Sequence, residues 1–148
     1  MKTLPSSPPH ILLVDDNRDG LLVRRLLLEE MGCCVEVATN GEEGLKLFES
    51  SDFDILVVDY RMPRMNGVEM IARVRARDAD ARIILVSSVA EPLGLTEENT
   101  GADVVIAKNA AEPTHLPRSI KRLLNRALLR KPPGRQQSAA ARARAMAR

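Results

Sequence analysis

The chain has 148 residues, of which 45% are apolar and 28% are charged. These proportions are typical of one folded domain and exclude a wholly disordered chain. No apolar run approaches the ~20 residues that span a bilayer, and the opening MKTLPSSPPH contains no apolar signal-peptide segment. We therefore expect a cytoplasmic protein without membrane contact.

The net charge of +2 is unevenly distributed along the chain. Residues 131–148 contain five basic residues and no acidic one, whereas the rest of the chain is net acidic. A mildly acidic folded part lacks the electrostatic footprint of a nucleic-acid-binding protein. We expect a flexible lead-in over residues 1–9, one folded domain over 10–130 and a basic, disordered tail over 131–148, with no specific nucleic-acid binding.

Five short apolar runs alternate with helical segments between residues 10 and 130. The expected strands are 11–14, 35–38, 55–58, 83–86 and 104–107, and the expected helices are 21–31, 41–50, 68–77 and 116–130. Gly32 is typical of a residue that closes a helix. Residues 88–103 contain Pro92 and Gly94, which favour only a short or irregular helix there. Continuously apolar strands are typical of a parallel sheet buried on both faces, so the pattern predicts a doubly wound α/β domain of five βα units.

Two pairs of neighbouring residues have simple structural interpretations. Arg24 and Arg25 are interpreted as part of a solvated face of the first helix. Cys33 and Cys34 would form a disulfide with each other only under strain, so we interpret them as small, partly buried residues near the second strand.

The candidate functional residues stand at the carboxyl ends of the expected strands. In a doubly wound sheet these ends face the crevice in which ligands bind. Carboxylates that meet there would repel one another unless a cation lay between them, and oxygen ligands of this kind suit Mg²⁺. A carboxylate beside Mg²⁺, an ammonium and a hydroxyl is an arrangement for phosphoryl transfer. The residues at these ends are Asp15 and Asp16, Asp59, Ser87 and Ser88, and Lys108.

Each of these residues alone has a commoner explanation. An Asp–Asp pair after a strand is more often a solvated turn, and a serine more often bonds a neighbouring backbone group. A single lysine is usually a surface residue. The coincidence of suitable residues at four strand ends is what favours a functional site.

The sequence resembles the receiver domains of bacterial two-component systems and is similar to the chemotaxis-type response regulators. The resemblance covers about residues 10–130. It rests on ILLVDDN (11–17), DILVVDYRMPRMNGVEM (54–70), IILVSS (83–88) and GADVVIAK (101–108). It implies a flavodoxin-like three-layer sandwich with the strand order 2-1-3-4-5.

The same resemblance implies a role for each site residue. Asp59 would be the phosphoacceptor of a single-domain response regulator, which captures one phosphoryl group and is not an enzyme. Ser87 would contact the phosphoryl group and reorient toward it, and Lys108 would pair with a phosphoryl oxygen. The partners would be a sensor histidine kinase or histidine phosphotransfer protein and a downstream protein target. The implied Mg²⁺ ligands are Asp15, Asp16, Asp59 and the backbone carbonyl of Arg61.

Three positions depart from the family pattern. Asn109 follows Lys108 where the family usually has proline, often with a cis bond. A cis bond before a residue other than proline is costly, so we expect a differently shaped loop, while the sequence leaves the isomer of this bond open. Val105 occupies the switch position, which is aromatic in the family. Pro92 and Gly94 interrupt the expected fourth helix. We therefore expect an output switch that differs from the family's usual one.

Two other functions remain open. One is a Mg²⁺-dependent phosphohydrolase with Asp59 as a transient nucleophile. Arg61 argues against it, because such enzymes have a second aspartate two residues after the nucleophile. The other is an atypical receiver that acts as an interaction module without phosphorylation, which the unusual fourth unit favours.

Overall fold

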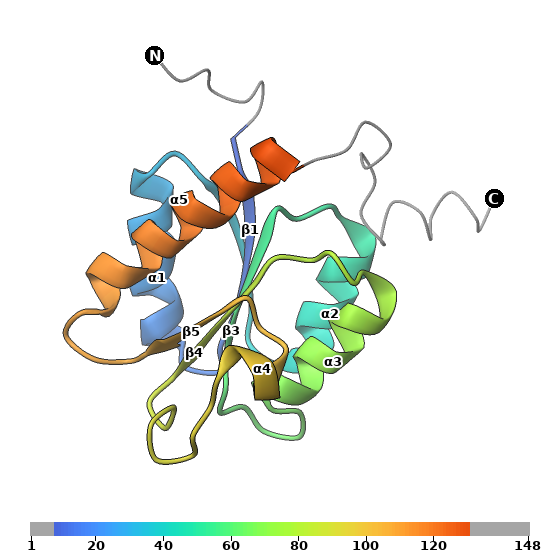
Figure 1. Cartoon of the computed structure of the whole chain (residues 1–148), viewed down its shortest axis with the longest axis vertical. Helices are drawn as coiled ribbons and strands as arrows, with labels where there is room; N and C mark the ends of the chain where they lie inside the picture. The colour runs from blue at the N-terminus through green and yellow to red at the C-terminus, as the bar shows by residue number, and fades with distance from the viewer. Residues whose placement is uncertain (1–7, 131–148) are drawn as a thin grey trace.

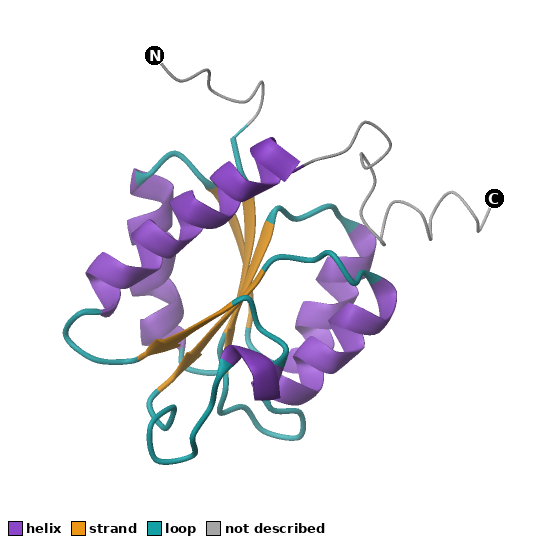
Figure 2. Ribbon diagram, viewed as in Figure 1, coloured by secondary structure: helices purple, strands orange, loops and turns teal. Residues whose placement is uncertain are grey.

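Five parallel strands alternate with five helices in the computed structural model, which describes residues 8–130 (Figures 1 and 2). The sheet order is β2-β1-β3-β4-β5, which confirms the expected flavodoxin-like topology. Most of the expected lead-in and the whole expected basic tail lie outside the described residues. The strands are β1 (His10–Val14), β2 (Cys34–Ala38), β3 (Ile55–Asp59), β4 (Ile83–Ser87) and β5 (Val104–Ala107), and the helices are α1 (Arg18–Glu30), α2 (Gly41–Ser50), α3 (Gly67–Arg77), α4 (Glu97–Thr100) and α5 (Glu112–Arg130).

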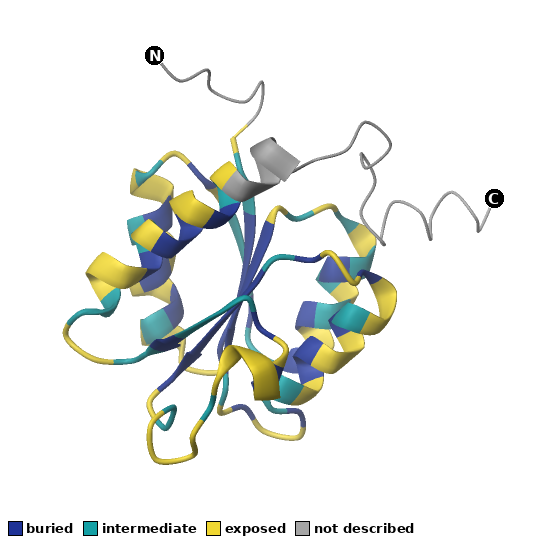
Figure 3. Cartoon of the chain, viewed as in Figure 1, coloured by how far each residue is buried: buried dark blue, intermediate teal, exposed yellow. Residues whose placement is uncertain are grey.

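Helices cover both faces of the sheet, which explains why its central strands are continuously apolar. α1 and α5 lie on one face, and α2, α3 and α4 lie on the other (Figure 1). Every residue of β3 and of β4 is buried (Figure 3). Successive side chains of a strand point to opposite faces, so one strand supplies two separate cores.

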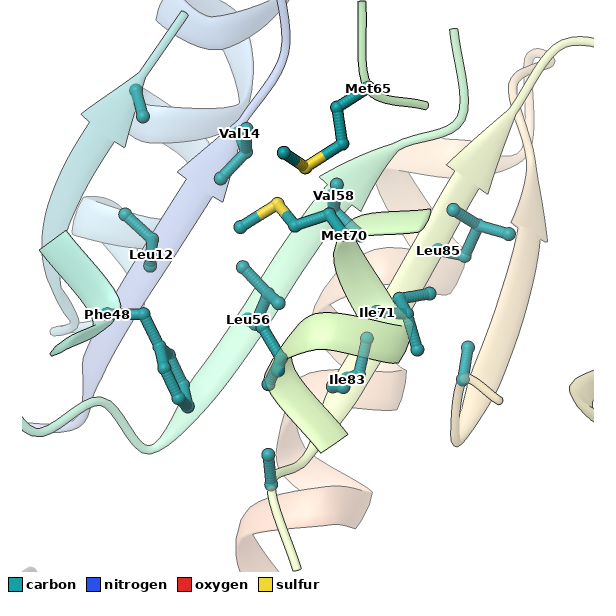
Figure 4. Close-up of a cluster of buried hydrophobic side chains, with 14 of the residues drawn as sticks. Leu12, Val14, Phe48, Leu56, Val58, Met65, Met70, Ile71, Ile83 and Leu85 are labelled. Atoms are coloured by element: carbon teal, nitrogen blue, oxygen red, sulfur yellow. The ribbon is translucent and has the colours of Figure 1, made fainter. Parts of the chain in front are cut away.

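The two cores lie on opposite sides of the sheet. Leu56 and Val58 of β3 belong to the core under α2 and α3, where Phe48, Met70 and Ile71 pack (Figure 4). The intervening residues of β3 belong to the second core, under α1 and α5. That core includes Ile55, Val57, Leu28, Leu116, Ile120 and Leu123. Burial of aliphatic side chains at ~25 cal/mol per Å² on both faces is the main force that holds the strand ends in register.

Two helices begin at least three residues earlier than the sequence predicted. α1 begins at Arg18, where the side chain of Asn17 accepts a hydrogen bond from the Gly20 amide. α5 begins at Glu112, four residues before the predicted start. Both first turns are polar, so they lie outside the apolar periodicity on which the prediction depended.

The end of α1 agrees with the prediction for Gly32. Its φ of 94° is in the left-handed region, and its amide donates to the Glu29 carbonyl. The Cys33 amide donates to the Leu28 carbonyl, so together the two bonds form a Schellman motif. Cys33 is buried and Cys34 is exposed, and both are free thiols.

The fourth βα unit is irregular, as predicted. Residues 88–94 form turns, and α4 is a single helical turn of four residues. Across residues 8–130 no peptide bond is cis, so the bond between Lys108 and Asn109, whose isomer the sequence left open, is trans. No helix in the same span is both long enough and apolar enough to cross a membrane.

Candidate functional site

A cleft of about 560 Å³ opens at the carboxyl ends of the strands. This edge is where ligands bind in open α/β sheets, because the connections from β1 and β3 leave toward opposite faces. Most of the residues predicted for the site line this cleft. They are Asp15, Asp16, Asp59, Arg61 and Lys108, joined by Ser88, a strand-end residue to which the sequence assigned no role.

Lys108 connects two buried carboxylates across the sheet. Its Nζ atom lies 2.6 Å from Asp59 Oδ1 and 3.5 Å from Asp15 Oδ2. Both carboxylates are almost fully buried, whereas Lys108 remains partly exposed to the cleft. The position of Lys108 follows from the register, because its amide donates to the carbonyl of Ser87 at the end of the neighbouring strand.

The Asp59 carboxylate carries an unfavourable charge in this environment. Burial is the main cause that raises its pKa, and the charge of Asp15 adds to the rise. Lys108 and Arg24 oppose the rise without cancelling it. The other carboxylate oxygen accepts the Arg61 amide at 3.1 Å, which fixes the side chain at the floor of the cleft. A further cation here would stabilise the ionised form.

Three carboxylates converge at the cleft with the chemistry of a divalent cation site. Oxygen atoms of Asp15, Asp16 and Asp59 all lie within 4.8 Å of one another. Carboxylates and carbonyls are the ligands that hard divalent cations prefer. Asp16 is exposed, and within residues 8–130 its side chain has no hydrogen-bond or ion-pair partner. The donor set therefore fits a divalent metal, with Asp16 the carboxylate most available to it.

Arg24 is the site residue that sequence reasoning missed. Its predicted place on a solvated face is wrong, since the residue is only 7% exposed. Its Nη1 atom donates to Asp15 Oδ2 at 2.7 Å, and its Nε atom donates to Glu112 Oε2 at 2.6 Å. Burial lowers the pKa of Arg24, but Glu112 and Asp15 outweigh burial and leave this pKa raised. Arg25 lies on the surface as expected and pairs with Glu29.

Gly67 allows α3 to approach the end of β3. Its amide donates to the Tyr60 carbonyl at 2.8 Å. A Cβ atom at this position would lie 2.6 Å from the backbone oxygen of Asp59. The preceding Asn66 caps the helix and forms a capping box with Glu69. The chain that leaves Asp59 therefore turns directly into a well-capped helix.

The family model of the response regulator receiver domain matches residues 11–121. The chain belongs to this family. Its resemblance to receiver domains, expected from four sequence motifs, is thereby confirmed. As a receiver domain the chain is a phosphoacceptor of two-component signalling and not an enzyme in the usual sense, so the phosphohydrolase alternative is wrong.

Relatives agree with this assignment. A probable transcriptional regulator, ycf27 of Cyanidium caldarium, is 30% identical over 118 residues, which cover 79% of this chain and 47% of the relative. The chain thus spans about half the length of that protein. The solved receiver domain protein from Methanospirillum hungatei has a TM-score of 0.74 and 31% identity, covering 80% of this chain and 95% of that one.

A third relative was solved with ligands and with a partner. The response regulator TrrA of Thermotoga maritima, in complex with Mg²⁺–BeF, has a TM-score of 0.71 and 30% identity, covering 78% of this chain and 98% of that one. TrrA was also solved in complex with the histidine kinase ThkA, where the TM-score is 0.69 and the identity 32%, with the same coverage.

The two serines at the end of β4 differ in their surroundings in this receiver. Ser87 is 1% exposed, and its hydroxyl accepts the Val89 amide at 2.9 Å. Ser88 is exposed and lines the cleft. Val105 is half-buried against the core under α3, and its amide donates to the side chain of Glu97 in α4. Ser87 and Val105 are thus both bonded to the irregular fourth unit.

Proposed function

We propose that Asp59 is the residue of this receiver that accepts the phosphoryl group. The observation that supports the proposal most strongly is the contact of 2.6 Å between Asp59 and Lys108 beside two further carboxylates. A carboxylate oxygen of Asp59 would attack phosphorus, and the bond from phosphorus to the donor nitrogen or acyl oxygen would break. The new P–O bond would make Asp59 an acyl phosphate.

Lys108 assists this transfer by moving its charge from carboxylate to phosphate. In the unphosphorylated receiver its ammonium neutralises Asp59. Once one oxygen of Asp59 is esterified, that oxygen loses its charge, and the ammonium pairs with a phosphoryl oxygen instead. A bound Mg²⁺ ion supplies further positive charge to the phosphoryl oxygens. Ser87 would donate its hydroxyl proton to a phosphoryl oxygen, and its movement toward the phosphoryl group would strain the bond that it accepts from the Val89 amide.

We assign the metal to Mg²⁺, held by Asp16, Asp59 and the backbone carbonyl of Arg61, with Asp15 supporting it from farther away. Both oxygens of Asp15 already accept bonds, one from the Asn17 amide and one from Arg24. Asp16 has no such engagement among the described residues. The binding of Mg²⁺–BeF by the relative TrrA supports the choice of metal.

This assignment predicts a ranking of metal affinities. Asp16→Asn should weaken Mg²⁺ binding by at least about tenfold, because a direct ligand and its charge are lost. Asp15→Asn should weaken binding less, since the two variants lose the same charge but only Asp16 has free oxygens. Calorimetric Mg²⁺ titrations of both variants measure the ranking, and equal affinities or the reverse order would contradict it.

The proposed phosphoryl donor is a sensor histidine kinase or a histidine phosphotransfer protein, and the phosphorylated receiver would act on a downstream protein. The complex of TrrA with the histidine kinase ThkA supports this choice of partner. We also propose that the folded domain does not bind nucleic acid specifically.

Intact-mass spectrometry with a small acyl-phosphate donor tests the proposal. The full chain with Mg²⁺ should gain one phosphoryl group, and with EDTA it should gain none. Continuous consumption of donor without a lasting mass change would indicate either catalytic turnover or a short-lived acyl phosphate. A dephosphorylation time course distinguishes these two explanations. No gain under any condition would favour the alternative of a phosphorylation-independent interaction module.

Activation should be read out through residues 88–101. Movement of the Ser87 hydroxyl toward a phosphoryl group breaks its bond to the Val89 amide, and Val89 itself accepts the Leu93 amide in the next turn. Val105 is β-branched and has no ring to rotate, so it cannot provide the family's aromatic switch. Backbone NMR with Mg²⁺ and beryllofluoride should show changed amide protection in this segment. Unchanged signals there, alongside shifts around Asp59, would refute the prediction.

A further inference from the structure

One guanidinium joins the acidic site to the beginning of α5. Arg24 belongs to α1, and α1 and α5 lie beside each other on one face of the sheet (Figure 1). It donates through Nη1 to Asp15 and through Nε to Glu112, with both contacts at 2.7 Å or less. Asp15 and Glu112 are 97 positions apart in the chain, so this contact depends on the tertiary fold.

The bridge is buried, so its charges act on the site with little screening by water. The side chains of Arg24 and Asp15 are 8% and 2% exposed, and that of Glu112 is 16% exposed. Gly20 leaves room for the guanidinium, since a Cβ atom there would lie 3.2 Å from Nη1. Charges in such surroundings interact more strongly than charges on the surface.

Arg24 and a divalent cation compete for the carboxylate of Asp15. The oxygen that accepts the guanidinium proton is also the one that lies 3.5 Å from Lys108 Nζ. Two protein cations therefore already neutralise this carboxylate. Each of them reduces the attraction of the acidic triad for a further cation. Glu112 acts in the opposite sense, because it neutralises Arg24 from the far side.

We infer that Arg24 is a positioning residue that holds Asp15 away from the metal and lowers the affinity of the acidic site for Mg²⁺, and that Glu112 moderates this effect. The inference rests on the proposed function, in which the acidic triad binds Mg²⁺. It assigns a role in metal affinity to one residue of α1 and one of α5, neither of which lines the cleft.

The inference predicts opposite effects for two substitutions in a single bridge. Arg24→Met removes a positive charge at similar length and should tighten Mg²⁺ binding by about tenfold. Glu112→Gln keeps an acceptor for the guanidinium but removes the negative charge, so binding should weaken by about threefold. A purely structural role would move both affinities in the same direction, since either substitution loosens the same contact between α1 and α5.

Calorimetric Mg²⁺ titration of the full chain measures these affinities, with circular dichroism to check folding. Arg24→Lys keeps the positive charge beside Asp15, on which the proposed effect depends, so its affinity should stay within about twofold of that of the wild type. Arg25→Met is the matched control, because Arg25 is the neighbouring arginine on the exposed face, paired with Glu29. Its affinity should equal that of the wild type.

Each result has a defined meaning. Tightening in Arg24→Met together with weakening in Glu112→Gln supports the inference. If Arg24→Met does not fold, weaker binding in Glu112→Gln with wild-type affinity in Arg24→Lys supports it. Unchanged or tighter binding in Glu112→Gln overturns it while leaving the proposed metal site intact. Absence of Mg²⁺ binding by the wild-type chain overturns the proposed metal site, and the inference fails with it.

Discussion

Asp59→Asn should leave the chain unable to take up a phosphoryl group. The amide oxygen of asparagine is a far weaker nucleophile than a carboxylate, and the substitution also removes one of the three carboxylates of the metal site. Intact-mass measurement with an acyl-phosphate donor and Mg²⁺ should show complete loss of the added mass. Phosphorylation of this variant at the wild-type level would place the acceptor elsewhere in the chain.

The matched control is Asp80→Asn. Asp80 is an exposed aspartate in the turn before β4, at the opposite edge of the sheet from the cleft. This variant should be phosphorylated like the wild type. A loss of labelling in both variants would point to a general effect of the substitutions on folding and not to the chemistry of Asp59.

The stability of Asp59→Asn distinguishes lost chemistry from lost folding. The pKa of Asp59 is raised, chiefly by burial, above its ordinary value of 3.8. The stability that the protonated carboxyl contributes is therefore complete below that value and is lost as the pH rises through the raised pKa of the folded state. In EDTA at neutral pH the variant should melt above the wild type. The difference should shrink as the pH falls toward 4, and thermal melts across this range measure it.

The strands were predictable because burial on both faces of the sheet requires a continuous run of apolar residues. All five predicted runs are strands, and each observed strand matches the prediction or extends it by one residue. The positions of Asp15, Asp59 and Lys108 follow directly, since each stands at or just after a strand end. The early turns of α1 and α5 were missed because polar first turns carry no periodic signal.

The side of α1 that faces the sheet was not predictable from its composition. Leu21, Arg24 and Leu28 have the spacing of one helix face and are the buried residues of α1. The neighbouring face is also apolar, yet Leu22, Val23 and Leu26 are more than half exposed. With apolar residues all round, the sequence offered no basis for burying an arginine. Its partner Glu112 lies in a turn that was not expected to be helical, so the charge that stabilises Arg24 was not identified either.

The distinction between Ser87 and Ser88 depends on a single position at the end of a strand. The pleat alternates side chains between the two faces, so a shift of one residue exchanges the buried serine for the exposed one. The predicted strand ended at residue 86, and the observed β4 ends at Ser87. Sequence reasoning could place a hydroxyl at the edge of the cleft, but it could not decide which serine lines it.

Gly67→Ala should destabilise the receiver by about 3 kcal/mol, because the new methyl group has no space. Its Cβ atom would lie 2.6 Å from the Asp59 carbonyl oxygen, 2.8 Å from a methyl carbon of Leu85 and 3.0 Å from the Tyr60 Cα atom. Two of these three atoms belong to the backbone, so α3 must move away from the end of β3.

Gly41→Ala is the matched control for this substitution, since Gly41 is also the first residue of a helix after an asparagine cap. The three nearest atoms to its Cβ atom would all belong to the side chain of Met65, with the sulfur at 2.8 Å. A flexible methionine can shift, so the cost should stay within about 1 kcal/mol. Thermal melts should therefore place Gly67→Ala roughly 10 °C below Gly41→Ala. The clash with the Asp59 carbonyl should also disturb the end of β3 that positions the Asp59 carboxylate beside Lys108, so Gly67→Ala should be phosphorylated more slowly at temperatures where it remains folded. Equal melting temperatures would mean that the backbone at the end of β3 can shift to accommodate the new methyl group. The close approach of α3 would then not be what fixes the position of Asp59.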